Sequence, residues 1–351
     1  HALVQDAAAD SLLRSKRQGL HQRIAKVLES DLQGVKEREP NLIAQHYARA
    51  DNAAKAVEYF ELANIKADKS LALEEAMQNF EEAMRFLDRM PESRENGLTR
   101  IRMLVSNNTV FLLLFRLLDY HALLSQFEPI AEELGDAELL GGLLARKGHC
   151  HWAFGELDKA IETLEVAADL CVQAGNQRDA DYAQMLLAWT CMLQGRLSDG
   201  LEHRNRAIRS LGQDFDVRWQ AWALAAGCLI NGWLGRWSDA IADGEAELAL
   251  AEKYSDESLE SFACWNLAFV HVGKGDLARA VEVAKQGIEC APTPADASWS
   301  LTPLGWAYSR LGGDQNGVGE LQTVVAANRA GNFVWGEQAA VILAEAHLPA
   351  R

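Results

Sequence analysis

The chain has 351 residues, 49% of them hydrophobic, and a formal net charge of −16 at pH 7. The hydrophobic content is ample for a packed core, and the acidic balance disfavours nucleic-acid binding, which needs clustered Lys and Arg. The longest apolar run, residues 110–115, is too short to cross a bilayer, so no membrane partner is expected. The six cysteines form no Cys-x-x-Cys pair and the first residues do not have the pattern of a signal peptide. These features predict a cytoplasmic protein with reduced thiols.

Residues 1–96 are predicted to be helical, in two parts. Residues 1–39 contain a basic amphipathic helix, SLLRSKRQGLHQRIAKVLE, which begins at Ser11. Its basic run (Arg14, Lys16 and Arg17) is either a solvated face or a contact with a neighbouring module. Residues 40–96 are predicted to form a three-helix adaptor, because apolar residues recur at intervals of three and four.

Residues 97–351 contain a repeat marked by glycine. The five glycines are spaced by 40, 40, 40 and 37 residues: Gly155, Gly195, Gly235, Gly275 and Gly312. A small residue lies seven positions before each glycine and another five positions after it. A fixed period of this size predicts an all-α superhelical array of antiparallel helix pairs. In each pair, helix A leads into a tight turn at the glycine, which accepts positive φ, and helix B follows.

The helix-B segments carry a family resemblance. The strings GELDKAIETLEVA from Gly155 and GDLARAVEVAKQGIECAP from Gly275, together with LGWAY at 304–308, resemble the tetratricopeptide repeat. The period of about 40 exceeds the 34 residues of that family, so longer helices or loops are expected. The last segment, GEQAAVILAEAHL, lacks the polar cap of a terminal repeat, and we expect the array to be truncated at its C-terminus.

The amino-terminal residues resemble a second family. HALVQDAAADSLLRSKRQGLHQRIAKVLE, followed by PNLIAQHYARADNAAKAVEYFELA, is similar to the junction in large bacterial signal-transduction ATPases between the ATPase module and a helical-repeat arm. Many such proteins carry a class III adenylate or guanylate cyclase domain, and others a DNA-binding domain. Asp10 stands where the family usually has an aromatic residue. The matching positions are His1, Ala2, Leu3, Val4, Gln5, Asp6, Leu12, Leu13, Arg17 and His21. The resemblance implies that residues 1–39 are the helical tail of a preceding ATPase module, and that the chain is a regulatory arm of a larger protein.

No motif in this chain predicts catalysis. No phosphate-binding loop is present, and the nearest string, GKGDLA from Gly273, is a repeat turn. The run His149-Cys150-His151 suggests a metal site, but adjacent helical residues point about 100° apart and cannot converge on one ion. We therefore expect a non-enzyme with no cofactor and no metal.

Aromatic residues are concentrated on one face of the A helices. The positions thirteen, ten, six and three residues before each glycine share a helical face, opposite the small-residue packing face. Trp233 lies beside this face, and a helix that began at Pro303 would leave Trp299 in a loop. The candidate residues are Trp152, Tyr182, Trp189, Trp222, Trp233, Phe262, Trp265, Phe269, Trp299 and Trp306.

Two interpretations of these rings remain open from the sequence. In one, the array curls tightly and the rings pack on each other as core. In the other, they line a concave groove that binds a partner. The second interpretation predicts a protein or peptide partner for a signalling module. The alternative is a small-molecule inducer, such as a sugar, stacked on the rings.

Overall fold

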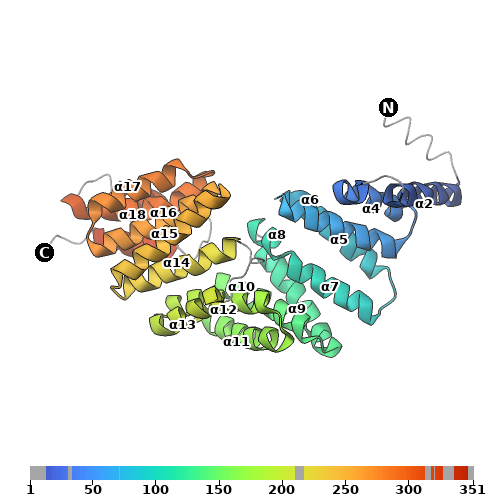
Figure 1. Ribbon diagram of the computed structural model, residues 1–351, viewed down its shortest axis with the longest axis horizontal. Helices are drawn as coiled ribbons and strands as arrows, with labels where there is room; N and C mark the ends of the chain where they lie inside the picture. Colours follow the sequence, from blue (N-terminus) through green and yellow to red (C-terminus); the bar gives the residue numbers. More distant parts are fainter. Residues whose placement is uncertain are drawn as a thin grey trace. The chain divides into compact units, whose positions relative to one another are not determined.

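The computed structural model describes residues 13–30, 34–70, 72–114, 116–209, 217–312, 318–319, 321–326 and 336–346. Regular secondary structure in these ranges is entirely helical and contains no strand, which confirms the all-α prediction (Figure 1). Contacts divide the chain into two compact units at residues 146 and 147. No helix in the described ranges is both long and apolar enough to span a bilayer.

The first unit is a succession of helices that pack on their neighbours in sequence. Three stacked pairs of rings among its described residues include Tyr47 with Tyr59, whose centroids lie 5.7 Å apart. The helices are α2 (Arg14–Ser30), α3 (Val35–Arg38), α4 (Pro40–Arg49), α5 (Ala53–Lys69), α6 (Leu73–Asp88), α7 (Arg94–Ser106), α8 (Asn108–Leu113) and α9 (Leu117–Leu134). Three of them, α4 to α6, occupy the segment where the sequence predicts a three-helix adaptor.

The repeat makes up the second unit, which begins inside the first A helix, because residues 137–146 of that helix belong to the first unit. The A helices begin at residues 137, 177, 217, 257 and 294, so their starts reproduce the sequence period. The A helices are α10 (Ala137–Ala153), α12 (Gln177–Leu193), α14 (Val217–Trp233), α16 (Glu257–Lys274) and α18 (Pro294–Gly312). The B helices are α11 (Leu157–Ala174), α13 (Leu197–Arg209), α15 (Trp237–Tyr254) and α17 (Leu277–Glu289), and α20 (Gly336–Ala346) comes last.

The turns between helices A and B depend on glycine at four of the five marked positions. Gly155, Gly195, Gly235 and Gly275 have φ values of 75°, 76°, 72° and 88°. This left-handed conformation costs glycine little because it has no Cβ. Gly312 is instead the last residue of α18, and residues 313–317 after it lie outside the described ranges.

The turns between repeats follow a related rule. Gly135 and Gly175 have positive φ. Ser255, at φ 53°, takes the same role in the turn between α15 and α16. An Asp or Asn follows each of these residues and accepts a hydrogen bond from the backbone N–H three positions later. This side-chain cap starts the next helix.

Small residues let the helices of the second unit approach closely. A Cβ added at Gly244 would lie 2.5 Å from a Leu267 methyl group, and one at Gly287 would lie 2.8 Å from the Cβ of Cys264. Both distances are far below van der Waals contact. Glycine at these two positions therefore lets α15 and α17 lie directly against α16.

Candidate functional site

The candidate site is a network of aromatic rings on the A helices of the second unit. Each A helix presents its rings toward the next A helix, because the 3-4-3 spacing places them on one face. The rings form a continuous chain of contacts from α10 through α12, α14 and α16 to α18. Successive ring contacts therefore link Trp152 at one end of this chain of rings to Trp306 at the other.

The first half of the network is centred on Trp222 of α14. Its ring centroid lies 5.8 Å from that of Trp152 and 5.8 Å from that of Trp189. The Trp189 indole N–H also donates to the Trp222 carbonyl oxygen at 3.0 Å. Tilted and edge-to-face pairs at these distances are favourable, so this cluster contributes to the packing of three repeats.

The second half continues from Phe262 of α16. Its ring lies 6.1 Å from Trp222 and 5.2 Å from Trp265. Trp265 in turn contacts Trp299 at 5.1 Å, and Phe269 contacts Trp306 at 5.9 Å. The rings thus connect α14, α16 and α18.

Burial divides the ten sequence-predicted residues into three groups. Trp152, Tyr182, Trp189, Trp265 and Phe269 are buried. The remaining members of the network are partly exposed, namely Trp222, Phe262, Trp299 and Trp306. Trp233 is 47% exposed, and none of the ring contacts within the described residues includes it. The rings pack on one another, as the core interpretation expects, and four of them remain partly accessible, as the binding interpretation expects.

Trp219 is a member of the network that the sequence analysis missed. Its ring lies 4.8 Å from Tyr182 and 5.8 Å from Trp222, and it is partly exposed. The signal was available, because Trp219 precedes Trp222 by three residues and so shares its helical face. We call Trp219, Trp222, Phe262, Trp299 and Trp306 the exposed rings.

Helix α18 includes Trp299. The helix begins at Pro294 and continues through Pro303, so Trp299 is helical and not in a loop. At the end of the network, the Arg310 guanidinium lies 4.9 Å from the centroid of the Trp306 ring. This cation–π contact shows that an exposed ring here accepts a cation on its face.

The run His149-Cys150-His151 serves packing. His149 Nδ1 hydrogen-bonds the Tyr182 hydroxyl, whereas His151 Nδ1 lies 2.6 Å from a Glu156 carboxylate oxygen. Burial raises the pKa of the Cys150 thiol to about 12, so the thiol is not a reactive nucleophile. No group of three or more His, Cys, Asp or Glu in the described part of the chain is arranged to hold a metal ion.

The two best-formed hollows of the described ranges lie away from the exposed rings. One lies along α13 beside Leu201 and Ile208. The other lies in the first unit beside Met77 and Phe127. The lining of neither includes an exposed ring.

Comparison with solved structures establishes the fold. No protein-family model and no curated protein matches the chain. The apo form of the quorum sensor NprR from B. thuringiensis is similar in structure, with a TM-score of 0.61 and 15% identity over 93% of this chain and 94% of that chain. A Rap protein complexed with competence and sporulation factor has a TM-score of 0.60 and 13% identity, over 95% of this chain and 94% of that chain.

A third structure is a signal-transduction ATPase with numerous domains from Pyrococcus horikoshii, which carries a tetratricopeptide repeat sensor. Its TM-score is 0.51 at 11% identity, and the match covers 94% of this chain but 49% of that chain. At these identities the similarities establish the fold. The chain has a tetratricopeptide-like helical-repeat fold, as the sequence predicted.

Proposed function

We propose that this chain is a non-catalytic recognition module that binds a segment of a partner protein on its exposed rings. The observation that carries the proposal is the continuous aromatic surface across α14, α16 and α18, part of which remains accessible. Accessible Trp and Phe side chains are the usual anchors of protein interfaces, because they remove much apolar area from water at little entropic cost.

The structural relatives support this class of function. A Rap protein is complexed with a signalling factor, NprR is a quorum sensor, and the archaeal ATPase carries its repeats as a sensor. These proteins use the same architecture to detect partners or signals. A non-enzymatic role for this chain agrees with them.

The finer proposal is that the module regulates an attached signalling ATPase or cyclase. Support comes from the resemblance of residues 1–39 to the junction in bacterial signalling ATPases and from the similar fold of the archaeal sensor. In such an arrangement, partner binding changes the activity of the attached module only if the partner binds the active and inactive states of the protein with different affinities. Full-length protein assayed with and without the partner tests this coupling.

The alternative ligand is a small-molecule inducer. A small ligand gains affinity mainly by entering a concave site that covers most of its surface. The two best-formed hollows of the described ranges lie away from the exposed rings. This observation favours an extended segment that lies across several repeats.

The test uses short random peptides displayed on phage and selected on the immobilised chain. Enriched peptides are synthesised, and their affinity is measured for the native chain and for Trp222→Ala. We expect a loss of about 1–3 kcal/mol in the free energy of binding, the cost of removing an anchor ring. The matched control is Trp233→Ala, because Trp233 is exposed on the same helix but lies outside the network.

Two results would contradict the proposal. One is that Trp222→Ala and Trp233→Ala bind the selected peptides as well as the native chain does. The other is that no peptide is enriched while a screen of sugars and other small planar compounds yields a ligand sensitive to Trp222→Ala, which would favour the inducer.

A further inference from the structure

A second accessible apolar surface lies on α2 in the first unit, outside the aromatic network. Leu13, Leu20, Ile24 and Val27 are 70%, 39%, 41% and 47% exposed. Leu13 belongs to the helix start, because its carbonyl oxygen accepts the backbone N–H of Arg17 at 3.1 Å. Their intervals of seven, four and three residues place all four on one stripe of the helix. We call these four residues the α2 stripe.

The intervals of the α2 stripe match those of a coiled-coil seam. If Leu20 is given heptad position d, Leu13 and Val27 are also d and Ile24 is a. Helices with apolar a and d positions pack by inserting these side chains between those of a second helix. The departure is residue 17, an a position occupied by Arg. The spacing therefore fits a helix as the covering element.

Cations border the α2 stripe. Lys16 and Arg23 fall at g positions of the same register and are exposed. No ion pair within the described residues includes either of these side chains. In helix pairs, residues at e and g form the salt bridges that choose the partner. An edge of unpaired cations selects carboxylates on the covering helix.

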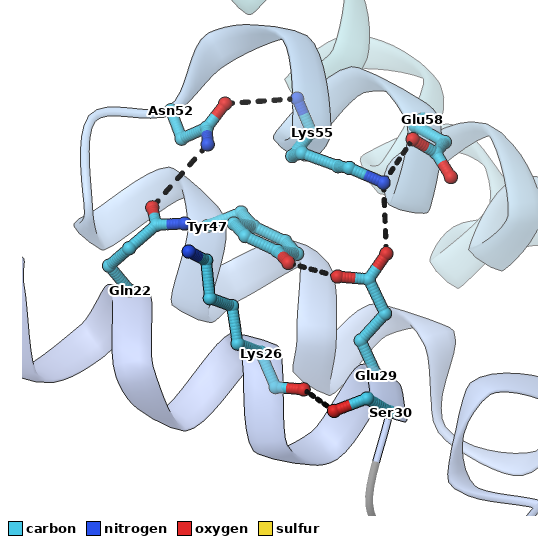
Figure 2. A network of polar contacts seen from close by, with 8 residues as sticks. All are labelled: Gln22, Lys26, Glu29, Ser30, Tyr47, Asn52, Lys55 and Glu58. Carbon is cyan, nitrogen blue, oxygen red and sulfur yellow. Dashed lines mark hydrogen bonds and ion pairs between the residues drawn. The ribbon is translucent and has the colours of Figure 1, made fainter.

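The acidic residue of α2 faces away from this edge. Figure 2 shows the Glu29 side chain directed toward α4 and α5, where its carboxylate accepts hydrogen bonds from Tyr47 of α4 and Lys55 of α5. The Lys55 Nζ atom lies 2.9 Å from Glu29 Oε1 and 2.9 Å from Glu58 Oε2. Glu29 is therefore fully engaged within the unit and does not neutralise Lys16 or Arg23.

The same network holds α2 in a fixed orientation. The side chain of Asn52, which caps α5, also donates to Gln22 at 3.4 Å, and the Nδ1 atoms of His21 and His46 lie 2.9 Å apart. Ala25 is completely buried on this inner face. With the inner face bonded to α4 and α5, the α2 stripe is presented outward.

We propose that the α2 stripe is a docking surface for an amphipathic helix of a partner protein that carries Asp or Glu beside its own apolar seam. The stripe supplies apolar area, and Lys16 and Arg23 supply register and charge selection. An anionic bilayer is a poorer fit, because the chain as a whole carries a net charge of −16 and is repelled by such a surface.

The experiment compares two synthetic helices as probes on the full chain. Both carry Leu at every a and d position; one carries Glu at e and g, and the other carries Lys there. Fluorescence anisotropy of each labelled helix gives its affinity. We expect the glutamate helix to bind at least about tenfold more tightly than the lysine helix. The reason is that Lys16 and Arg23 attract the glutamate side chains and repel the lysine side chains.

Variants of the chain assign the binding to the α2 stripe. Ile24→Asp places a carboxylate in the stripe and should weaken the glutamate helix about tenfold or more. The double variant Lys16→Glu/Arg23→Glu should reverse the preference in favour of the lysine helix. The control Val172→Asp alters a residue of α11 that is 60% exposed, and it should bind as the native chain does. Circular dichroism confirms that each variant keeps its helix content.

Several outcomes would overturn the proposal. They are failure of the glutamate helix to bind, equal binding of both helices, and full binding by Ile24→Asp. Sedimentation of the chain with phosphatidylcholine and phosphatidylserine vesicles that is lost in Ile24→Asp would instead assign the stripe to a bilayer. A concentration-dependent dimer lost in Ile24→Asp would assign it to a second copy. Because Trp222→Ala should leave helix binding unchanged, the outcome is independent of the exposed rings.

Discussion

Glu247 on α15 and Asn266 on α16 are paired in the interior of the second unit. The Asn266 amide nitrogen lies 3.3 and 3.2 Å from the two carboxylate oxygens, and both residues are 0% exposed. Burial raises the pKa of Glu247 well above its usual value, the hydrogen bond from Asn266 opposes this only in part, and the nearby Asp243 raises it further. The fold therefore stabilises the protonated carboxylic acid.

This pairing predicts a pH dependence of stability. Because the folded protein binds the Glu247 proton more tightly than the unfolded chain, the free energy of unfolding should fall as the pH rises above 4.5, the ordinary value for Glu. Glu247→Gln keeps a neutral side chain and should be about 1–3 kcal/mol more stable than the native chain at neutral pH. Urea unfolding at several pH values measures both effects. The control is Glu245→Gln on the exposed face of α15; equal pH dependence in all three proteins would contradict the prediction.

Glu29, in the first unit, should make the free energy of unfolding depend on pH in the opposite direction. Burial opposes its ionisation, but hydrogen bonds from Lys55 and Tyr47, together with the nearby Tyr59 hydroxyl, outweigh this and lower its pKa to about 2. The stabilisation is therefore complete above the ordinary value of 4.5 and is lost as the pH falls toward about 2. Glu29→Gln should cost about 1–2 kcal/mol at neutral pH and little in strong acid. Hydrogen exchange of the α2 amides measures this loss of stability. An equal cost of Glu29→Gln at neutral pH and in strong acid would contradict the prediction.

The repeat turns predict a glycine-specific cost. Gly235 has φ 72°, and no atom lies within 4 Å of the position that its Cβ would occupy. Gly235→Val should cost about 1–3 kcal/mol from backbone strain alone, because β-branched residues resist this conformation. Gly235→Asn should cost less, because Asn tolerates positive φ. Thermal unfolding of the two variants tests the ranking, and equal melting temperatures would contradict it.

The aromatic network predicts that buried and exposed rings respond differently. Trp265 is 2% exposed, and Trp265→Ala should cost about 3–5 kcal/mol of stability. Trp306 is partly exposed at the end of the network, so Trp306→Ala should cost less stability and act mainly on partner binding. Melting temperature and affinity for a selected peptide are measured for both. An equal loss of stability would mean that the rings act only as core.

The absence of a phosphate-binding loop from the sequence predicts no nucleotide chemistry in the isolated chain. Isothermal titration with ATP and Mg²⁺ should show no saturable binding at micromolar concentration. Saturable binding would reopen the enzyme interpretation.

The sequence by itself determined the helical repeat and its turns. Gly155, Gly195, Gly235 and Gly275 specify their turns through φ, and the Asp or Asn caps act within one helical turn. Such signals are local, so they can be read from spacing alone. The 3-4-3 spacing likewise predicted which aromatic residues share a helical face.

Only the tertiary structure decided which of those residues are accessible. Trp189 and Trp222 occupy the same predicted face, yet the first is 1% exposed and the second partly exposed. Their difference depends on how closely each A helix approaches its neighbours, and no local pattern encodes that distance. The burial of Glu247 and the outward orientation of the α2 stripe have the same origin. Exposure depends on which helices pack against a side chain, and those contacts join residues far apart in the sequence.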